Sequence, residues 1–385
     1  MLKRPEEIQT LKILLRRYPV VGLVGARQVG KTTLARLLIR ESASPVSYFD
    51  LENPADQARL GDPMLGLKDL RGLVVIDEIQ RLPEIFPILR VLGDRRPLKT
   101  RFLILGSASP ELIQRSSESL AGRIAYHELT GFSLPEVGSG NIERLWIRGG
   151  FPSSYLAPTS KASMDWRLRF VRTFLERDLP QLGVFVRSTT LRRFWSMLAH
   201  YHGQIWNSSE LARSFGVADT TIRNYLDLLS SALVVRQLAP WSENISKRQV
   251  KSPKIYVSDS GLLHSLLNLG TIRELQAHPK LGASWEGFLI GQIARLLGAR
   301  PEECFFWATH AGAELDFLLV RGRSRIGFEI KRTLAPQLTP SMKIALEDLK
   351  LSRLVVIHAG EETFSLAKRV LAIPVRKVTA ELKKL

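Results

Sequence analysis

The 385-residue sequence contains a single cysteine, Cys304, and no long uninterrupted run of apolar residues. One cysteine excludes an internal disulfide framework and any zinc site built from several cysteines. The longest apolar runs fall short of the roughly 18 residues that a membrane-spanning helix needs, and the opening MLKRPEEIQTLKILL does not have the pattern of a secretory signal. We therefore expect a cytoplasmic protein with no membrane partner.

Acidic residues are also scarce relative to basic ones. The chain has 37 Asp and Glu against 55 Lys and Arg, which gives a formal net charge of +18. Such an excess attracts polyanions, and it favours nucleic acid over an anionic membrane. Hydrophobic residues make up 45% of the chain, an ordinary share for a globular protein of two or three domains. DNA is therefore the expected partner.

The most informative motif lies near the N-terminus. It runs Gly25-Ala26-Arg27-Gln28-Val29-Gly30-Lys31-Thr32-Thr33 and matches the phosphate-binding pattern G-x-x-x-x-G-K-[ST]. An apolar segment expected to be a strand precedes it, and a segment expected to be a helix follows. In such a loop the backbone N–H groups face the phosphates, Lys31 reaches the β- and γ-phosphates, and Thr32 ligates Mg²⁺. Thr33 would support the start of the helix. The motif predicts binding of ATP with Mg²⁺.

Asp77 and Glu78 follow a second apolar run, LVVI, at the carboxyl end of a predicted strand. An aspartate there can hold the Mg²⁺ shell, and a following glutamate can orient or deprotonate the attacking water. Ser107 ends the next predicted strand and is either a γ-phosphate or water contact or an ordinary turn serine. Arg123, or Arg115 in its place, is either an arginine finger for a neighbouring subunit or a member of a surface ion pair. This set of residues predicts ATP hydrolysis.

Short apolar strands alternate with helices through the first part of the chain, a pattern typical of an α/β fold with a mostly parallel sheet. The domain boundaries that we predict are 1–140 for this P-loop ATPase core, 141–204 for a helical lid region, 205–272 for a winged helix and 273–385 for a small α/β domain. In the helical region, Trp166 and several arginines, Arg167 among them, suggest a basic helix face.

Residues 207–238 have the spacing of a helix-turn-helix. Ser208 or Ser209 is expected to cap the first helix, and Asp219 or Thr220 the second. The residues expected to contact DNA are Thr220, Thr221, Arg223 and Asn224 at the start of the second helix, and Lys247, Arg248, Lys251 and Lys254 in the basic segment that follows. Such a fold also serves as a lid or as a protein-contact module, and this alternative stays open.

The C-terminal region carries Asp316 in one apolar strand and Glu329-Ile330-Lys331 in the next. Residues 329 and 331 project from the same face of a strand. This D…E-x-K arrangement is that of restriction-endonuclease-like nucleases, in which the carboxylates bind Mg²⁺ and the lysine activates water. Glu286, on a predicted helix, would add a further metal ligand, and Glu314 is an alternative one. The alternative is that Glu329 and Lys331 form an ion pair with each other on a solvated strand face.

These motifs, together with VVIDEIQRLPE, LILGSASPEL, SLAGR, GGFP and FLERDLP, resemble the AAA-family ATPases that bear a C-terminal DUF4143 domain. The resemblance covers nearly the whole chain. It implies a P-loop ATPase core, a winged-helix region and a nuclease-like C-terminal domain, in a homo-oligomer for which a ring is one expected arrangement. The function expected from all of these features is Mg²⁺-dependent ATP hydrolysis acting on DNA by binding, remodelling or translocation, with branched DNA as one candidate substrate. The C-terminal domain is expected to bind or cleave the DNA. The alternatives are a nucleotide-controlled regulatory switch whose C-terminal domains bind protein partners, and a helper ATPase with an inactive nuclease fold.

Overall fold

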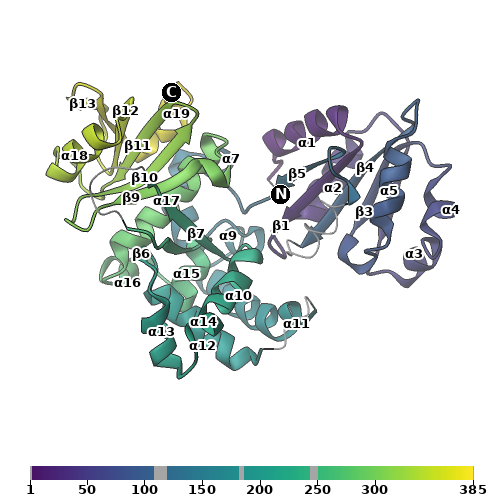
Figure 1. Ribbon diagram of the computed structural model, residues 1–385, viewed down its shortest axis with the longest axis horizontal. Helices are drawn as coiled ribbons and strands as arrows, with labels where there is room; N and C mark the ends of the chain where they lie inside the picture. The colour runs from purple at the N-terminus through teal and green to yellow at the C-terminus, as the bar shows by residue number, and fades with distance from the viewer. Residues whose placement is uncertain (1, 108–118, 182–185, 243–249, 385) are drawn as a thin grey trace. The chain divides into compact units, whose positions relative to one another are not determined.

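The computed structural model describes residues 2–107, 119–181, 186–242 and 250–384 (Figure 1). It divides into two compact units, Met1–Gly131 with Ser231–Leu233, and Phe132–Ser230 with Val234–Leu385. None of the helices within the described ranges has the length and apolar character needed to cross a membrane.

The first unit is built on a five-stranded sheet in the order β2-β3-β4-β1-β5. All of its strand pairs are parallel, as the sequence predicts. The strands are β1 Val20–Gly25, β2 Val46–Asp50, β3 Gly72–Asp77, β4 Thr100–Ser107 and β5 Ile124–Glu128. The described helices are α1 Pro5–Arg17, α2 Lys31–Arg40, α3 Pro54–Arg59, α4 Pro63–Leu67 and α5 Ile85–Gly93. Because β4 lies between β1 and β3, the ends of these three strands share one edge of the sheet.

The second unit begins with a helical region packed around aromatic side chains. Its helices are α7 Leu134–Val137, α8 Ile142–Arg148, α9 Pro152–Tyr155, α10 Ser160–Thr173, α11 Leu179–Gln181 and α12 Ser188–His200. Phe170 stacks on Trp166 and on Phe174, which in turn contacts Trp195. The expectation that Arg167 lies on a basic surface face is wrong. Its side chain is 1% exposed and donates hydrogen bonds to the backbone carbonyls of residues 147 and 261, at 3.1 and 2.7 Å.

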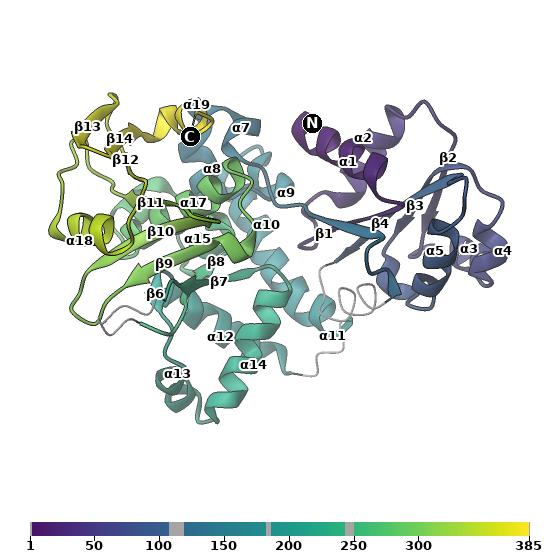
Figure 2. The same cartoon turned by 45° about the horizontal axis from the view of Figure 1, so that its top comes forward.

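The two helices of the predicted helix-turn-helix are α13 Ser208–Phe215 and α14 Asp219–Ser231, with Gly216 in the left-handed conformation between them. The cap of α13 is Asn207, whose side-chain oxygen accepts from the Glu210 N–H, so the expectation of a Ser208 or Ser209 cap is wrong. Helices α12, α13 and α14 lie side by side (Figure 2), because Phe194 of α12 packs on the rings of Phe215 and Tyr225.

The remaining strands of the second unit form a single nine-stranded sheet in the order β13-β14-β12-β11-β10-β9-β7-β8-β6. Strand β7 pairs in parallel with β9, so strands from both sides of the boundary predicted at residue 272 belong to one sheet. The strands are β6 Gln204–Ile205, β7 Val235–Pro240, β8 Lys254–Val257, β9 Cys304–Ala308, β10 Glu314–Arg321, β11 Ser324–Ile330, β12 Arg353–His358, β13 Phe364–Ala367 and β14 Val370–Pro374. The accompanying helices are α15 Ser260–Leu266, α16 Ile272–Gln276, α17 Leu281–Leu296, α18 Pro340–Asp348 and α19 Val378–Leu382. Helix α17 contacts β11, and α18 contacts β10, β11 and β12.

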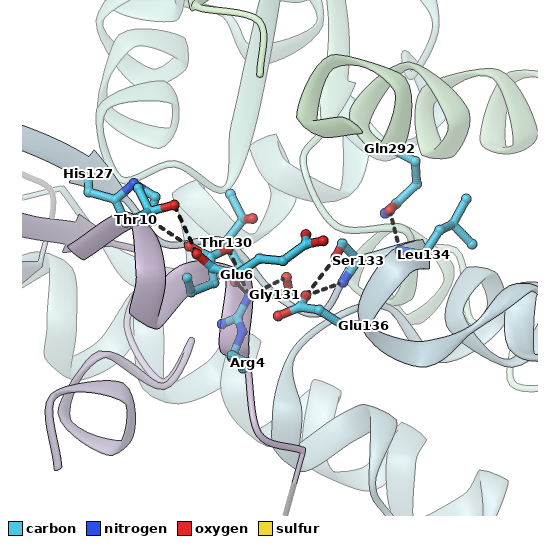
Figure 3. Close-up of polar contacts among 11 residues, drawn as sticks. Arg4, Glu6, Thr10, His127, Thr130, Gly131, Ser133, Leu134, Glu136 and Gln292 are labelled. Carbon is cyan, nitrogen blue, oxygen red and sulfur yellow. Dashed lines mark hydrogen bonds and ion pairs between the residues drawn. The ribbon is translucent and has the colours of Figure 1, made fainter. Parts of the chain in front are cut away.

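Polar contacts hold the chain on either side of the division between residues 131 and 132 (Figure 3). In the first unit, the guanidinium of Arg4 donates to the carbonyl of Thr130 at 3.0 Å. In the second, the N–H of Leu134 donates to the buried side-chain oxygen of Gln292 at 2.9 Å. The chain segments before and after this division are therefore each hydrogen-bonded within their own unit.

Candidate functional site

The glycine-rich loop connects β1 to α2, as the motif requires. Gly30 has a φ of 104° and precedes the first residue of α2, a conformation that favours glycine. A side chain at Gly25 would come within 2.3 Å of the Leu129 carbonyl oxygen, so this position also needs glycine. The structure thus explains why glycine is needed at both fixed glycine positions of the motif. The loop leads directly into the N-terminus of a helix, where anions bind.

Lys31 is folded back over the loop. Its ammonium donates to the carbonyl oxygens of Gly25 and Ala26, at 2.9 and 3.1 Å, and the side chain is 7% exposed. Burial lowers the pKa of Lys31 from 10.5 to about 8, although Glu78 and Asp77 act in the opposite direction. A cation held by two carbonyl groups near a helix N-terminus is well placed to exchange these partners for phosphate oxygens.

Thr32 and Asp77 meet where the first turn of α2 reaches the end of β3. The Thr32 hydroxyl donates to Asp77 Oδ2 at 2.7 Å. The Tyr48 hydroxyl, from β2, donates to the same oxygen at 2.8 Å, and the Glu78 N–H donates to Oδ1 at 3.0 Å. Burial first, and then the Asp77 charge, raise the pKa of Tyr48. The Thr32 hydroxyl and the Asp77 carboxylate together fit Mg²⁺, which prefers hydroxyl, carboxylate and water ligands.

Glu78 follows Asp77 with a φ of 54°, in the left-handed region, which is uncommon for a residue other than glycine. The Gln80 side-chain amide donates to its carboxylate. Ser107 ends β4 in register with Gly25 of β1, but its side chain lies outside the described residues, as does Arg115. The structure thus brings together the strand ends that carry Gly25, Asp77 and Ser107.

Arg123 lies elsewhere in the first unit. Its carbonyl accepts from the Val20 N–H, which places it at the amino ends of the strands, opposite the phosphate loop. Its guanidinium donates to Asp94 at 2.6 Å and is about one-third exposed. The surface ion pair that the sequence left open as an alternative is therefore present.

The C-terminal acids converge, as the D…E-x-K pattern predicts. Asp316 on β10 and Glu329 on β11 are both buried, and the Ile330 N–H donates to Asp316 Oδ2 at 2.7 Å. The Lys331 ammonium pairs with Glu329 Oε1 at 2.7 Å, while Glu329 Oε2 has no hydrogen-bond partner among the described residues. Burial, followed by the charges of Glu286 and Glu329, raises the pKa of Asp316 well above its usual range.

Lys254 completes this cluster, and here the sequence expectation is wrong. A basic segment predicted to contact DNA phosphates would expose its lysines, yet Lys254 is 3% exposed. Its ammonium lies 3.1 Å from Glu286 Oε1 and also pairs with Glu314. The Tyr256 hydroxyl donates to the same Glu286 oxygen at 2.5 Å. Lys254 therefore belongs to the carboxylate cluster of the second unit and faces away from solvent.

The predicted metal ligands Glu286, Asp316 and Glu329 do not fit a divalent ion in this arrangement. The Lys254 ammonium already lies at the carboxylate of Glu286, and its charge also acts on Asp316, where it partly offsets the rise in pKa that burial causes. Within the described part of the chain, no group of three or more histidine, cysteine or carboxylate side chains is arranged to hold a metal ion.

The expected DNA contacts are divided between several places. Arg223 and Lys251 line one groove of about 730 Å³. The aromatic residues Tyr201 and Trp206 also line this groove. Asn224 is exposed and Thr221 half-buried on α14, whereas Lys247 and Arg248 lie outside the described residues.

Some site residues carry no signal in the sequence. Tyr48 reaches Asp77 only because β2 pairs with β3, with Asp50 opposite Asp77. Gln80 stands two residues after Glu78 in a short turn that the apolar pattern does not predict. Lys254 reaches the C-terminal acids through the pairing of β7 with β9 and with β8.

A glycine-rich loop after one strand of a parallel sheet, and a carboxylate hydrogen-bonded to its threonine from another, define a P-loop ATPase core. Family models agree along the chain. An AAA domain matches residues 17–138, a domain of unknown function (DUF8612) matches 139–273, and a second one (DUF4143) matches 281–378.

The uncharacterized protein Rv2008c of Mycobacterium tuberculosis is 51% identical over 378 residues, which are 98% of this chain and 85% of that protein. The uncharacterized protein Mb2031c of Mycobacterium bovis gives the same values. Among solved structures, the Walker-type ATPase paby2304 of Pyrococcus abyssi is 17% identical with a TM-score of 0.48, over 69% of this chain and 96% of that one. The chain belongs to the AAA-family P-loop ATPases with a C-terminal DUF4143 domain, a family in which nucleotide binding, usually with Mg²⁺, is the rule.

Proposed function

We propose that the protein is a Mg²⁺-dependent ATPase that acts on DNA. The observation that supports the ATPase half most directly is the 2.7 Å hydrogen bond between Thr32 and Asp77 beside the phosphate loop. In this proposal the backbone of residues 25–33 binds the phosphates, Lys31 pairs with the β- and γ-phosphates, and Thr32 with Asp77 holds Mg²⁺. The metal supplies charge neutralisation on the phosphate oxygens when it is bound.

Glu78 is the proposed general base. Its carboxylate accepts from Gln80, so it must turn from that amide toward the attacking water before it can take a proton. Ser107, which ends the strand between the two motif strands, is the proposed contact to the γ-phosphate or to that water. Hydrolysis would then follow from residues on three strand ends of the first unit.

The proposed DNA contact lies on the groove lined by Arg223 and Lys251. Both side chains are exposed and positively charged, whereas Lys254 of the same segment is buried and paired. Together with the net charge of +18, these residues support binding to the phosphate backbone, which carries no sequence information by itself. Thr221 and Asn224 of α14 complete the proposed surface. Lys247 and Arg248, which we also expect to contact DNA, lie outside the described residues.

We also propose a homo-oligomer in which Arg123 serves a neighbouring subunit as an arginine finger. Arg123 lies at the sheet edge opposite its own phosphate loop, so it can act only in trans. It must also leave Asp94 to do so. Assembly would therefore exchange an intramolecular ion pair for a phosphate contact between subunits.

ATP hydrolysis measured with single-stranded, duplex and branched DNA tests this function. We expect Mg²⁺-dependent turnover that at least one DNA stimulates, and Lys31→Ala should lower it by about a hundredfold or more. Asp316→Asn, in the other unit, serves as the matched control and should leave basal turnover unchanged. Turnover that no nucleic acid stimulates would contradict the DNA role and favour a nucleotide-controlled switch that binds protein partners.

A further inference from the structure

The carboxylate cluster of the second unit contains a cation of its own. We propose that Lys254 is the resident cation of this site: its ammonium takes the position that the D…E-x-K pattern predicts for Mg²⁺, so that the cluster joins β8, α17 and β10 and binds no divalent metal ion. This inference concerns the second unit alone and does not depend on ATP hydrolysis in the first.

The position of the ammonium supports this assignment. Lys254 Nζ contacts Glu286 of α17 at 3.1 Å and Glu314 of β10, and it lies 5.6 Å from the centre of the Phe306 ring. Two carboxylates and the face of an aromatic ring are the surroundings in which a buried cation is stabilised. With 3% of Lys254 exposed, these groups replace the water that would otherwise solvate its charge.

Tyr256, on the same strand, also contacts the Glu286 carboxylate. Tyr256 lies two residues after Lys254 on β8, so both side chains project from the same face of the strand. The Tyr256 hydroxyl and the Lys254 ammonium both donate to Glu286 Oε1, at 2.5 and 3.1 Å. The protein's own donors thus occupy one of the two Glu286 oxygens that could bind a metal ion.

The other two acids are engaged in the same way. Asp316 Oδ2 accepts from the Ile330 N–H at 2.7 Å, and Glu329 Oε1 accepts from the Lys331 ammonium at 2.7 Å. Each predicted metal ligand therefore has an internal donor to one of its oxygens, while Glu329 Oε2 has no hydrogen-bond partner among the described residues. A divalent ion at Glu286 would also face the Lys254 ammonium, which repels it.

Burial alone would favour loss of the Lys254 proton. Burial lowers the pKa of Lys254, but Glu286, Glu314 and Asp316 together outweigh it, so that the net shift is above the usual range. The side chain therefore stays charged at neutral pH and acts as a permanent counter-ion. This supports the geometric argument without replacing it.

Mn²⁺ binding to the full-length protein without nucleotide, followed by electron paramagnetic resonance, tests the proposal. We expect the wild type and Asp316→Asn to bind Mn²⁺ equally weakly. Lys254→Met should gain one site at least tenfold tighter than any in the wild type, and Asp316→Asn in that background should remove it. Lys343→Met, an exposed lysine on α18, is the matched control and should behave as the wild type.

Thermal unfolding adds a second readout. Lys254→Met should melt at a lower temperature than the wild type, because the largely buried Glu286 carboxylate loses its ammonium partner and keeps only the Tyr256 hydroxyl, and Mn²⁺ should restore part of the loss. A wild-type Mn²⁺ site that Asp316→Asn abolishes would overturn the proposal. A folded Lys254→Met protein that gains no Mn²⁺ site would also overturn it. If that variant does not fold, the comparison of the wild type with Asp316→Asn still shows whether the wild-type carboxylate cluster binds Mn²⁺.

Discussion

Because the ammonium of Lys31 is buried, replacing Lys31 with methionine should stabilise the nucleotide-free first unit while it abolishes ATP binding. The lysine is 7% exposed, and its hydrogen-bond partners among the described residues are two backbone carbonyls. The folded protein therefore holds a charge that water would solvate better in the unfolded chain. That cost is recovered only when phosphates bind.

The magnitude follows from the pKa. A fall from 10.5 to about 8 corresponds, at about 1.4 kcal/mol for each pH unit, to a cost of about 3 kcal/mol for the charged form. The variant also leaves two carbonyl groups without their donor, at a cost of about 1–2 kcal/mol. The expected net gain in the free energy of unfolding at pH 7 is therefore about 1–2 kcal/mol.

The sign of the pH dependence is fixed by the direction of the shift. Between pH 8 and 10.5 the unfolded chain keeps the Lys31 proton that the folded chain has lost, so wild-type stability rises with pH through this window. The methionine variant has no such term. The extra free energy of unfolding of Lys31→Met over the wild type should be fully present below pH 8 and should shrink steadily toward pH 10.5.

Urea unfolding followed by circular dichroism at pH 7 and pH 9.5 measures this difference. All seven tryptophans lie between residues 146 and 307, in the second unit, so a transition that tryptophan fluorescence does not report belongs to the first. Lys99→Met, at an exposed lysine of the first unit, is the matched control and should show no such pH trend. A Lys31→Met protein less stable than the wild type at pH 7, or an advantage independent of pH, would refute the reasoning.

Two further predictions concern the contacts around the proposed sites. Tyr48→Phe removes one hydrogen-bond donor from the Asp77 carboxylate. We expect the Mg²⁺ concentration for half-maximal ATPase activity to rise about tenfold, with ATP affinity little changed. An equal loss of ATP affinity would argue against a role for Tyr48 in positioning Asp77. Arg223→Ala and Lys251→Ala should each weaken DNA binding equally for different sequences, and each should reduce the salt slope by about 1 in log–log titrations; a loss confined to one sequence would indicate base contact instead.

The sequence predicts those parts of the structure that depend on local patterns. Strands β1, β3 and β4 of the first sheet contain short apolar runs, and the phosphate loop is a contiguous motif in which the backbone angle at Gly30 and the close approach of a carbonyl at Gly25 both require glycine. The alternation of side chains along β11 also predicts that Glu329 and Lys331 share a face, and they form an ion pair. These features need no knowledge of which strands are neighbours.

Features that depend on distant pairing were missed. Tyr48 and Asp77 are 29 residues apart and meet through the order of strands in the first sheet. Arg167 has the spacing of a surface arginine, yet its partners are carbonyl groups from α8 and α15, which fold around it. Burial of this kind lowers the pKa of Arg167 to about 10, although Asp259 acts in the opposite direction. No local pattern distinguishes such an arginine from its solvated neighbours.

Lys254 shows why this distinction matters for function. Net charge is a property of the whole chain, whereas binding to a polyanion needs cations that reach solvent. Lys254 and Arg167 count toward the charge of +18, yet one is paired with carboxylates and the other with backbone carbonyls, both in the interior. If the second unit binds DNA as we propose, the positive charge must come from exposed side chains such as Arg223 and Lys251. If Lys254 is the resident cation that we propose, its charge and those of Glu286 and Glu314 offset one another inside the second unit, and Lys254 contributes nothing to a surface that binds a polyanion.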